Sequence, residues 1–190
     1  MIVITSEGQY GGPGAVLALG MFDGVHLGHR SLICRARELA KALNADAMVC
    51  TFDRHPLSVL RPEAAPAALM PLEDRLKAFE ELGADYALVK PFTRELADTP
   101  AEEFLASLVR SARAKAVVCG ENYTFGHRGR GGSAMIETMA RALGYRAVIM
   151  PSVKDGGDVV SSTLIRTLAE RGELEEARRF LGHSYLFLES

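Results

Sequence analysis

Several familiar signatures are missing from this chain of 190 residues, and each absence removes a class of protein. The chain has no apolar run of the about 20 residues that a membrane-spanning helix requires. Residues 1–4 are apolar but lead directly into the polar segment 5–8, so neither the basic region nor the apolar core of a signal peptide is present. We therefore expect a cytoplasmic protein without a membrane partner.

Paired cysteines and an excess of one charge are also missing. Cys34, Cys50 and Cys119 are far apart and form no C-x-x-C pair, which favours reduced, structural thiols over a zinc site. The 22 lysines and arginines are balanced by 24 acidic residues, for a formal net charge of -2. This balance argues against a nucleic-acid partner, and any anionic ligand must be held by local positive features.

The common nucleotide and hydrolase motifs do not occur either. The chain has no G-x-x-x-x-G-K-[ST] and no G-x-S-x-G sequence, which excludes a P-loop and a nucleophile elbow. Gly12 and Gly14 precede an apolar run instead of following it, and Leu17 stands where a dinucleotide fingerprint has its third glycine. The dinucleotide fingerprint is therefore rejected as well.

The chain does contain a regular alternation of apolar and amphipathic segments. Short apolar runs predict strands at residues 15–19, 45–52, 85–89, 114–120 and 145–151. Helical patterns follow at residues 32–43, 71–83, 99–109, 133–143, 159–172 and 173–182. This order predicts an α/β fold, a doubly wound parallel sheet of about five strands with helices on both faces. With 48% hydrophobic residues, we expect residues 1–190 to form a single domain around one core.

Four polar segments follow the predicted strands. They are residues 20–29, 53–56, 120–132 and 161–166. In a parallel sheet such segments meet beyond the carboxyl ends of the strands, where ligands bind. The sequence therefore predicts one crevice that is shared by segments far apart in the chain.

Two histidines lie in the first of these segments. His26 and His29 flank Gly28 where the first predicted strand passes into a helix. Glycine allows a ligand to approach the backbone, the first turn of a helix has unpaired N–H groups, and each imidazole can donate a hydrogen bond. The pattern favours a phosphate-binding turn, while satisfied loop histidines or half of a metal site remain alternatives.

The motifs resemble a known family. Residues 20–29, GMFDGVHLGH, match the G-x-F-D-x-x-H-x-G-H signature of the nucleotidyltransferase superfamily. Three further segments, FDRHP (52–56), GENYTFG (120–126) and VSSTLIR (160–166), resemble the FMN adenylyltransferase module of bacterial FAD synthetases in their order and separation. The resemblance covers nearly the whole chain and implies a Rossmann-like nucleotidyltransferase fold. It also implies an enzyme that uses ATP and Mg²⁺ to transfer AMP to the phosphate of FMN, giving FAD and pyrophosphate.

The resemblance further implies roles for individual residues. His26 and His29 would hold the ATP phosphates, and Asn122 and Arg166 would lie at the reacting centre. The other implied binding residues are Ser162 and Thr163 at the nucleotide phosphates, Phe22, Asp23, Gly24 and Gly28 at the turn beside the nucleotide, and His55, Pro56, Tyr123 and Phe125 toward the flavin. We assign no protein ligand to the magnesium ion, which ATP phosphates and water would hold.

Two features depart from the family pattern. Many members carry Asp-Phe where this chain has Asn122 and Tyr123. Bifunctional members also continue into a riboflavin kinase barrel. We expect this domain to be absent here, and therefore no phosphorylation of riboflavin.

The same residues also fit structural roles. Arg166 fits a solvated surface charge, Asn122 fits a turn, and alternate aromatic residues such as Tyr123 and Phe125 fit a half-buried strand face. Residues 127–132 fit either a mobile phosphate flap or a solvated loop. The charged segment EDRLKAFEEL, residues 73–82, fits an ordinary exposed helix face.

The implied chemistry needs no general base. The second pKa of a phosphate monoester is about 6, so the attacking phosphate of FMN is already largely a dianion at neutral pH. We therefore expect the histidines to donate hydrogen bonds rather than abstract protons. Two alternatives remain: a related nucleotidyltransferase with another phosphorylated acceptor or with CTP, and a noncatalytic sensor of flavin nucleotides.

Overall fold

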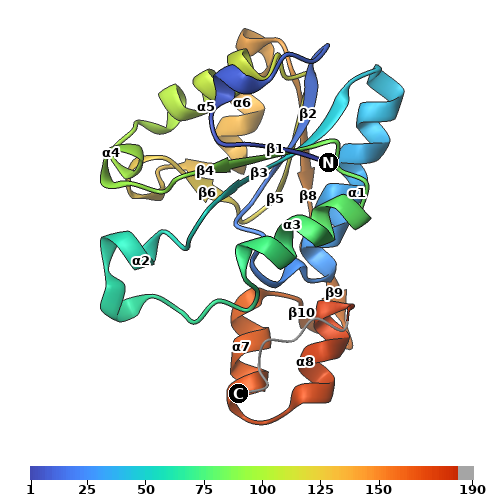
Figure 1. Cartoon of the computed structure of the whole chain (residues 1–190), viewed down its shortest axis with the longest axis vertical. Helices are drawn as coiled ribbons and strands as arrows, with labels where there is room; N and C mark the ends of the chain where they lie inside the picture. The colour runs from blue at the N-terminus through green and yellow to red at the C-terminus, as the bar shows by residue number, and fades with distance from the viewer. Residues whose placement is uncertain (184–190) are drawn as a thin grey trace.

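A parallel β-sheet forms the centre of the protein (Figure 1), whose computed structural model describes residues 1–183. Within these residues the main sheet has six strands in the order β1-β4-β3-β2-β5-β8, and every neighbouring pair is parallel. The strands are β1 (Ile2–Ile4), β2 (Ala15–Leu19), β3 (Asp46–Phe52), β4 (Tyr86–Lys90), β5 (Ala116–Gly120) and β8 (Arg146–Met150). The predicted α/β fold is confirmed, and its five predicted strands correspond to the last five of these.

The sixth strand, β1, lies at one edge of the sheet and was not predicted. It pairs in parallel with β4, so that Ile2 lies opposite Tyr86. Ile2 and Val3 are 55% and 47% exposed. A strand of three residues at a sheet edge is too short to show a periodic pattern, which explains why sequence patterning missed it.

Eight helices accompany the strands within the described part of the chain. They are α1 (Leu27–Leu43), α2 (Leu57–Leu60), α3 (Leu72–Glu81), α4 (Arg94–Ala97), α5 (Ala101–Ser111), α6 (Ser133–Leu143), α7 (Ser162–Glu170) and α8 (Leu174–Leu181). All but α2 and α4, which have four residues each, correspond to predicted helices. The ends follow local rules: α6 stops at Gly144 and α1 at Asn44, both with positive φ, a conformation that glycine and asparagine adopt readily.

Short elements complete the loops between these helices and strands. Two small hairpins are formed by β6 (Thr124–Phe125) with β7 (Gly131–Gly132) and by β9 (Lys154–Asp155) with β10 (Asp158–Val159). The short 3-10 helices are η1 (Glu7–Gln9), η2 (Asp23–Val25), η3 (Pro62–Ala64) and η4 (His127–Gly129).

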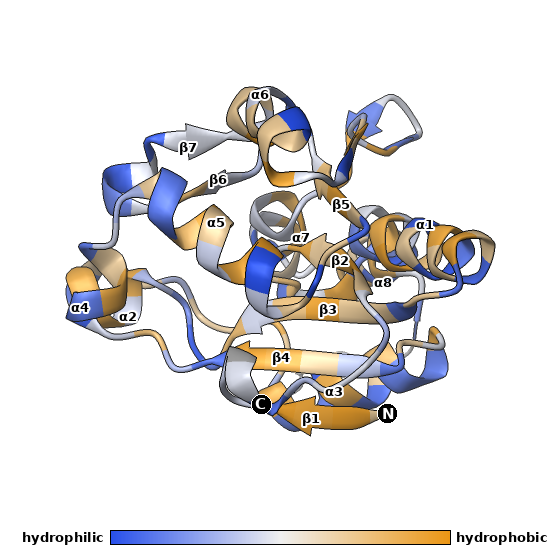
Figure 2. Ribbon diagram, turned by 90° about the horizontal axis from the view of Figure 1, so that it is seen from above, coloured by the Kyte–Doolittle hydropathy of each residue, from blue (hydrophilic) through white to orange (hydrophobic). Residues whose placement is uncertain are grey.

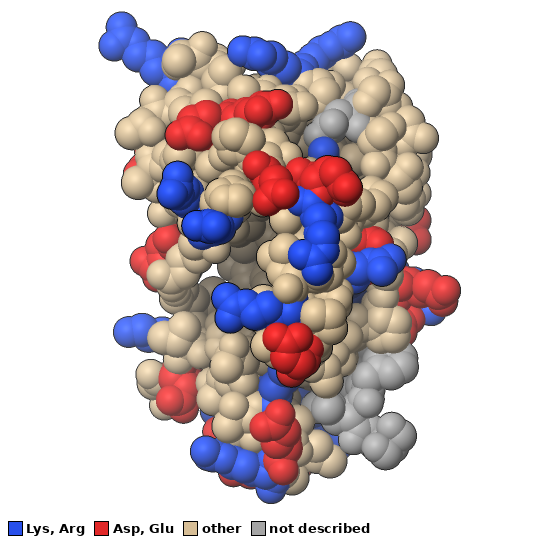
Figure 3. Space-filling view, turned by 90° about the vertical axis from the view of Figure 1, so that its left-hand side faces the viewer, with Lys and Arg blue, Asp and Glu red and all other residues tan. Residues whose placement is uncertain are grey.

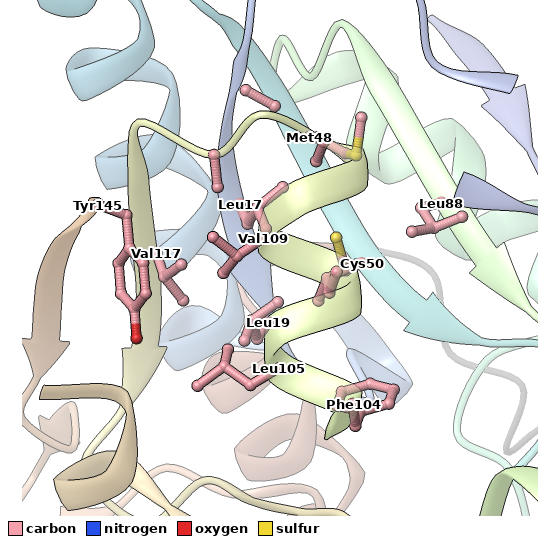
Figure 4. Close-up of a cluster of buried hydrophobic side chains, with 14 of the residues drawn as sticks. Leu17, Leu19, Met48, Cys50, Leu88, Phe104, Leu105, Val109, Val117 and Tyr145 are labelled. Atoms are coloured by element: carbon pink, nitrogen blue, oxygen red, sulfur yellow. The ribbon is translucent and has the colours of Figure 1, made fainter. Parts of the chain in front are cut away.

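The two faces of the sheet bury alternate residues of each strand. On β2, Val16 and Ala18 pack in a cluster with α1 and α3, whereas Leu17 and Leu19 pack in a cluster with α5 and α6. Figure 4 shows the second cluster, with Leu105 of α5 beside the leucines of β2. In Figure 2 the central strands are largely hydrophobic, whereas α1 and α5 also carry hydrophilic residues. Burial on both faces explains why β2 reads as an unbroken apolar run.

Helices α7 and α8 form a small separate cluster beyond the carboxyl ends of the strands (Figure 1). Phe180 and Leu181 of α8 are almost fully buried there. The end of α8 also lies close to the segment 20–29. A Cβ atom added at Gly24 would be 3.2 Å from the side chain of Leu181. His183 lies 2.8 Å from the carbonyl oxygen of Gly24 through its Nε2 atom. None of the helices in the described residues is long and apolar enough to cross a membrane.

One expectation about the helices holds only in part. In the segment 73–82, predicted to be an exposed charged face, Glu73, Lys77, Glu80 and Glu81 are exposed. The prediction is wrong for Arg75 of α3, which is only 3% exposed. Its guanidinium donates hydrogen bonds to carbonyl oxygens of Met21, Phe52 and Asp53. These acceptors are backbone atoms at or just after the ends of β2 and β3, so no pattern within the helix could have revealed them.

Candidate active site

Loops at the carboxyl ends of the strands enclose a cavity of about 250 Å³, here called the histidine cavity. It is lined by Leu19, Gly20, Met21, His26, Gly28, His29, Leu32 and residues 120–123, 151–153 and 159–161. The predicted segments 20–29 and 120–132 therefore share one cavity, and Ser161 adds the first residue of segment 161–166. Segment 53–56 lies outside it.

The two histidines stack against each other at the start of α1. His26 is the N-terminal cap of the helix, and its Nδ1 accepts a hydrogen bond of 3.3 Å from the backbone N–H of His29. The ring centroids are 3.6 Å apart with an interplanar angle of 17°. Because Nδ1 of His26 is an acceptor, this hydrogen bond assigns the proton of the neutral ring to Nε2. His26 can therefore donate from Nε2.

The backbone before the histidines adopts an uncommon conformation. Phe22 and Val25 have φ values of +53° and +40°, and Gly24 between them has +78°. Positive φ is uncommon for residues other than glycine and strained for a β-branched residue. The Phe22 ring is fully buried, with its centroid 5.2 Å from that of His29 and 5.5 Å from that of Phe79. This packing holds the strained turn, and such strain is concentrated at functional sites.

Burial keeps both imidazoles neutral. It lowers the pKa of His26 to about 4. For His29, burial holds the pKa well below its ordinary value, and electrostatic interactions with the nearby His26 ring and the Arg75 guanidinium lower it further. A neutral imidazole has one N–H donor and one acceptor nitrogen. At neutral pH the pair can therefore donate hydrogen bonds to an anion but does not supply positive charge.

Asn122 enters the same cavity from the loop after β5. Its Nδ2 donates to Oγ of Ser152 at 3.2 Å, and Glu121 Oε1 accepts from the N–H and the Oγ of Ser152 at 2.8 and 2.6 Å. These hydrogen bonds lower the pKa of Glu121. Ser152 therefore ties the loop after β5 to the loop after β8. Ser152 was not predicted, and the only available signal was that the two preceding strands are neighbours in the sheet.

The start of α7 contributes Ser161 to the cavity. Ser161 is the N-terminal cap of the helix and accepts a hydrogen bond of 3.2 Å from the N–H of Leu164. Ser162 instead donates from its Oγ to the carbonyl oxygen of Asp23 at 2.9 Å, and Thr163 is exposed. Ser162 and Thr163 were predicted as binding residues but Ser161 was not, although serine and threonine at a helix start are the usual sign of a cap.

Arg166 lies apart from the histidine cavity. Its guanidinium forms an ion pair with Asp23, and its Nε donates to the carbonyl oxygen of Ala67 at 2.7 Å. The carboxylate of Asp23 also accepts from the backbone N–H groups of Leu69 and Met70. In this arrangement Arg166 and Asp23 anchor the loop that precedes α3. The role of Arg166 at the reacting centre stays a prediction.

The residues predicted to lie beside the nucleotide do not all line the histidine cavity. Gly28 lines the histidine cavity, and a side chain added there would lie 3.1 Å from Cε1 of His26. Phe22 and Gly24 are buried behind the histidines and do not line that cavity. The positive φ values at this turn direct the Phe22 ring into the core. Phe22 and Gly24 therefore support the turn from behind.

A second cavity, also of about 250 Å³ and here called the loop cavity, adjoins the first at Met21. Asp23, Arg54, His55 and Arg75 are among the residues that line it. His55 Nδ1 accepts a hydrogen bond of 3.1 Å from the N–H of Leu57. Burial and the nearby charge of Arg166 lower the pKa of His55.

A row of aromatic rings leads from the histidine cavity to a third cavity of about 230 Å³, here called the aromatic cavity. Tyr123 lines the histidine cavity and stacks on Phe125 with centroids 5.6 Å apart and an angle of 21°. The row continues from Phe125 to Phe104 (6.0 Å), Phe52 (6.5 Å) and Phe92 (5.0 Å). Phe125 and Pro56 line the aromatic cavity. Three of the four residues predicted toward the flavin therefore adjoin this row or its cavity, whereas His55 lines the loop cavity.

Basic side chains lie along these cavities. Figure 3 shows a hollow on the face where α2 and α4 lie, with Lys and Arg side chains near its mouth. Lys90 Nζ is 5.7 Å from the centroid of Phe104, and Arg128 lines the aromatic cavity. Arg128 belongs to the segment 127–132, for which both a phosphate flap and a solvated loop were predicted as alternatives.

The described residues contain no group of three or more His, Cys, Asp or Glu side chains arranged to hold a metal ion. Glu121 is the carboxylate residue in the lining of the histidine cavity, and it already accepts hydrogen bonds from Ser152. This donor set fits a magnesium ion that is bound mainly by the phosphates of a nucleotide.

The fold and cavities together define a Rossmann-like α/β protein with its candidate site at the carboxyl edge of a parallel sheet. The FAD synthetase family matches residues 11–164. The chain belongs to this family.

Known proteins resemble the chain in sequence and in structure. The bifunctional riboflavin kinase/FMN adenylyltransferases of Listeria monocytogenes and Escherichia coli K12 are 35% and 32% identical to it, each over 90% of the chain. The match covers 54% and 55% of those proteins, so the chain spans about half their length. A solved Streptococcus pneumoniae structure, named a macrolide-efflux protein, superposes with a TM-score of 0.83 at 27% identity, covering 95% of this chain and 59% of the other.

Proposed function

We propose that this chain is an FMN adenylyltransferase, which transfers AMP from ATP to the phosphate of FMN and gives FAD and pyrophosphate. Family membership and the names of the Listeria and Escherichia coli relatives support the proposal. The observation that carries it is the position of Tyr123, which lines the histidine cavity and begins the aromatic row. The cavity proposed to bind phosphates thus adjoins a surface suited to a planar ring.

In this proposal the ATP phosphates bind at the histidine turn. His26 and His29 donate N–H groups to phosphate oxygens, and the start of α1 adds unpaired backbone N–H groups. The amide of Asn122 faces the same space. Ser161 and the exposed hydroxyl of Thr163 stand at the start of α7, where they can contact the same nucleotide.

The reaction requires positioning and charge stabilisation. An oxygen of the FMN phosphate forms a bond to the α-phosphorus of ATP, while the bond from that phosphorus to the bridging oxygen of pyrophosphate breaks. The attacking phosphate is already anionic, so no side chain needs to remove a proton. Neutral histidines suit this task because the remaining N–H of a neutral imidazole is a very weak acid, so it donates a hydrogen bond to growing negative charge without giving up its proton. A magnesium ion held mainly by the ATP phosphates would supply further charge neutralisation.

The flavin is proposed to lie along the aromatic row. Tyr123, Phe125 and Pro56 provide ring and apolar contacts, and burial raises the pKa of the Tyr123 hydroxyl, which stays protonated. Arg166 reaches the reacting phosphates in this proposal once its ion pair with Asp23 opens.

The test is to incubate the purified chain with ATP, Mg²⁺ and FMN and to measure FAD by chromatography and pyrophosphate by a coupled assay. We expect both products in equal amounts. Parallel reactions with CTP, and with other phosphorylated acceptors, identify the alternative nucleotidyltransferase. Tight FAD binding without turnover would instead indicate a flavin-nucleotide sensor. Ser107→Ala, on the exposed side of α5, is a control that should leave the rate unchanged.

A further inference from the structure

Arg75 is a buried cation that connects two loops of the site. Its side chain donates from Nη1 to the carbonyl oxygen of Met21 (2.9 Å) and to Oγ1 of Thr51 (3.3 Å). Its Nη2 donates to the carbonyl oxygens of Phe52 and Asp53, both at 3.1 Å. A buried guanidinium is tolerated only when it is well hydrogen-bonded. These bonds hold the ends of β2 and β3 together directly beside the histidine turn.

One donor of Arg75 has no such acceptor. Among the described residues, the buried side-chain polar atoms without a hydrogen-bond partner are Nε of Arg75 and Nδ1 of His29. An arginine Nε always carries a proton and can only donate, while a neutral imidazole has one nitrogen that can only accept. The two unpartnered atoms are therefore complementary, because a proton on Nε2 of His29 leaves Nδ1 as the acceptor. Buried polar groups left unpaired are rare in folded proteins.

We propose that Arg75 is a positioning residue for His29: its Nε–H reaches Nδ1 of His29 through one water molecule, and this bridge holds the His29 proton on Nε2. The proposal rests on the adenylyltransferase function above, because that function requires His29 to donate an N–H group to phosphate oxygens. With Nδ1 occupied, Nε2–H is the donor that His29 presents to the histidine cavity, which its ring lines.

The surroundings of His29 agree with this role. The charged and titratable groups that act on its ring are His26 in the same turn and Arg75 from α3, and both disfavour a protonated imidazole. The Phe22 ring packs edge-on against His29, at 65°, and carries no charge. Arg75 thus acts twice, since its charge keeps His29 neutral and its Nε–H selects the tautomer.

The direct test is nitrogen NMR of the histidine side chains in the protein without substrates. Shifts of Nδ1 and Nε2 distinguish the two neutral tautomers, and His29→Gln identifies the His29 signals. We expect His29 to be the Nε2–H tautomer and not to titrate between pH 5.5 and about 8. An Nδ1–H tautomer in the unsubstituted protein overturns the proposal even if every Arg75 variant fails to fold.

Variants of Arg75 add a kinetic test. Arg75→Lys keeps the positive charge but lacks the Nε–H donor, so the His29 tautomer should become mixed and kcat should fall about 10- to 100-fold. The KM for FMN should change less than about threefold, because the substitution removes no side chain of the aromatic row. Lys77→Met, on the exposed part of the same helix, is the matched control and should change neither quantity.

The two measurements separate the possible failures. If the tautomer is as expected and becomes mixed in Arg75→Lys, but no FAD is made, the function is wrong and the positioning role stands. If FAD is made and Arg75→Lys leaves both the tautomer and kcat unchanged, the positioning role is wrong.

Discussion

The substitution Gly28→Ala at the histidine turn is expected to lower activity while changing the free energy of unfolding little. Gly28 is the second residue of α1 and has no positive φ, so its backbone accepts alanine. Alanine in a helix is more favourable than glycine by up to about 1 kcal/mol. The new methyl group, however, would lie 3.1 Å from Cε1 and 3.2 Å from Nδ1 of His26. These distances are shorter than ordinary van der Waals contact, so the His26 ring must move.

The size of that movement sets the expected loss of activity. Restoring normal contact requires a shift of several tenths of an ångström, and the methyl group also enters the histidine cavity. A displacement of about 1 Å at a reacting group can cost about 10²-fold in rate. We expect kcat/KM for ATP to fall at least about 10-fold, while the free energy of unfolding changes by less than about 1 kcal/mol.

The assay is steady-state FAD formation at varied ATP, together with urea denaturation of the same samples. Gly11→Ala is the matched control, because a side chain added at Gly11 meets no atom within 4 Å. An unchanged kcat/KM in Gly28→Ala, with a folded protein, would refute the placement of ATP phosphates at His26.

Three further predictions concern the same turn. First, His29→Ala should lower kcat about 10²- to 10³-fold, as expected for loss of one donor to a developing charge. The FMN dissociation constant, measured by fluorescence titration, should change little. A comparable loss of kcat and of FMN affinity would contradict the assignment. The second prediction concerns the pKa of His26, which is about 4 in the folded protein and about 6.5 in the unfolded protein. Between these pH values the unfolded state binds more protons. The free energy of unfolding should therefore fall by up to about 3 kcal/mol as the pH decreases from 6.5 to 4. His26→Gln should show a shallower loss in urea titrations across that range, and an identical slope argues against a buried neutral His26. Third, Asp23→Asn should reduce the free energy of unfolding by about 2 to 3 kcal/mol, because a charged acceptor of three hydrogen-bonding partners is lost. The control Glu38→Gln, at an exposed ion pair, should change the free energy of unfolding by less than about 0.5 kcal/mol. Similar losses in both variants would contradict a structural role for Asp23.

The main elements of the fold could be predicted because they depend on local patterns. The strand β2 is buried on both faces, so it appears as an unbroken apolar run, and α6 ends at Gly144 as helix-ending rules predict. The edge strand β1 could not be found in this way, because its few residues are partly exposed and its pairing partner lies more than 80 residues later.

The candidate site was predictable only in part, because its geometry depends on contacts between distant segments. His26, His29 and Asn122 share a cavity because their loops follow neighbouring strands β2 and β5, as the alternation of strands and helices suggests. The ion pair between Asp23 and Arg166 joins residues far apart in the chain, and it removes Arg166 from that cavity. No local pattern indicates such a pairing.

Buried Arg75 illustrates the same limit. Within α3 its neighbours are charged, so the helix pattern predicts exposure. Its burial follows from backbone acceptors at the ends of two strands, which become available only when the sheet has formed.

The most direct test of the account is a crystal structure of the protein with FAD bound. We predict phosphates of the dinucleotide within hydrogen-bonding distance of Nε2 of His26 and of His29, and the flavin ring against Tyr123 along the aromatic row. A flavin seated in the loop cavity beside His55, with the phosphates away from both histidines, would contradict the account.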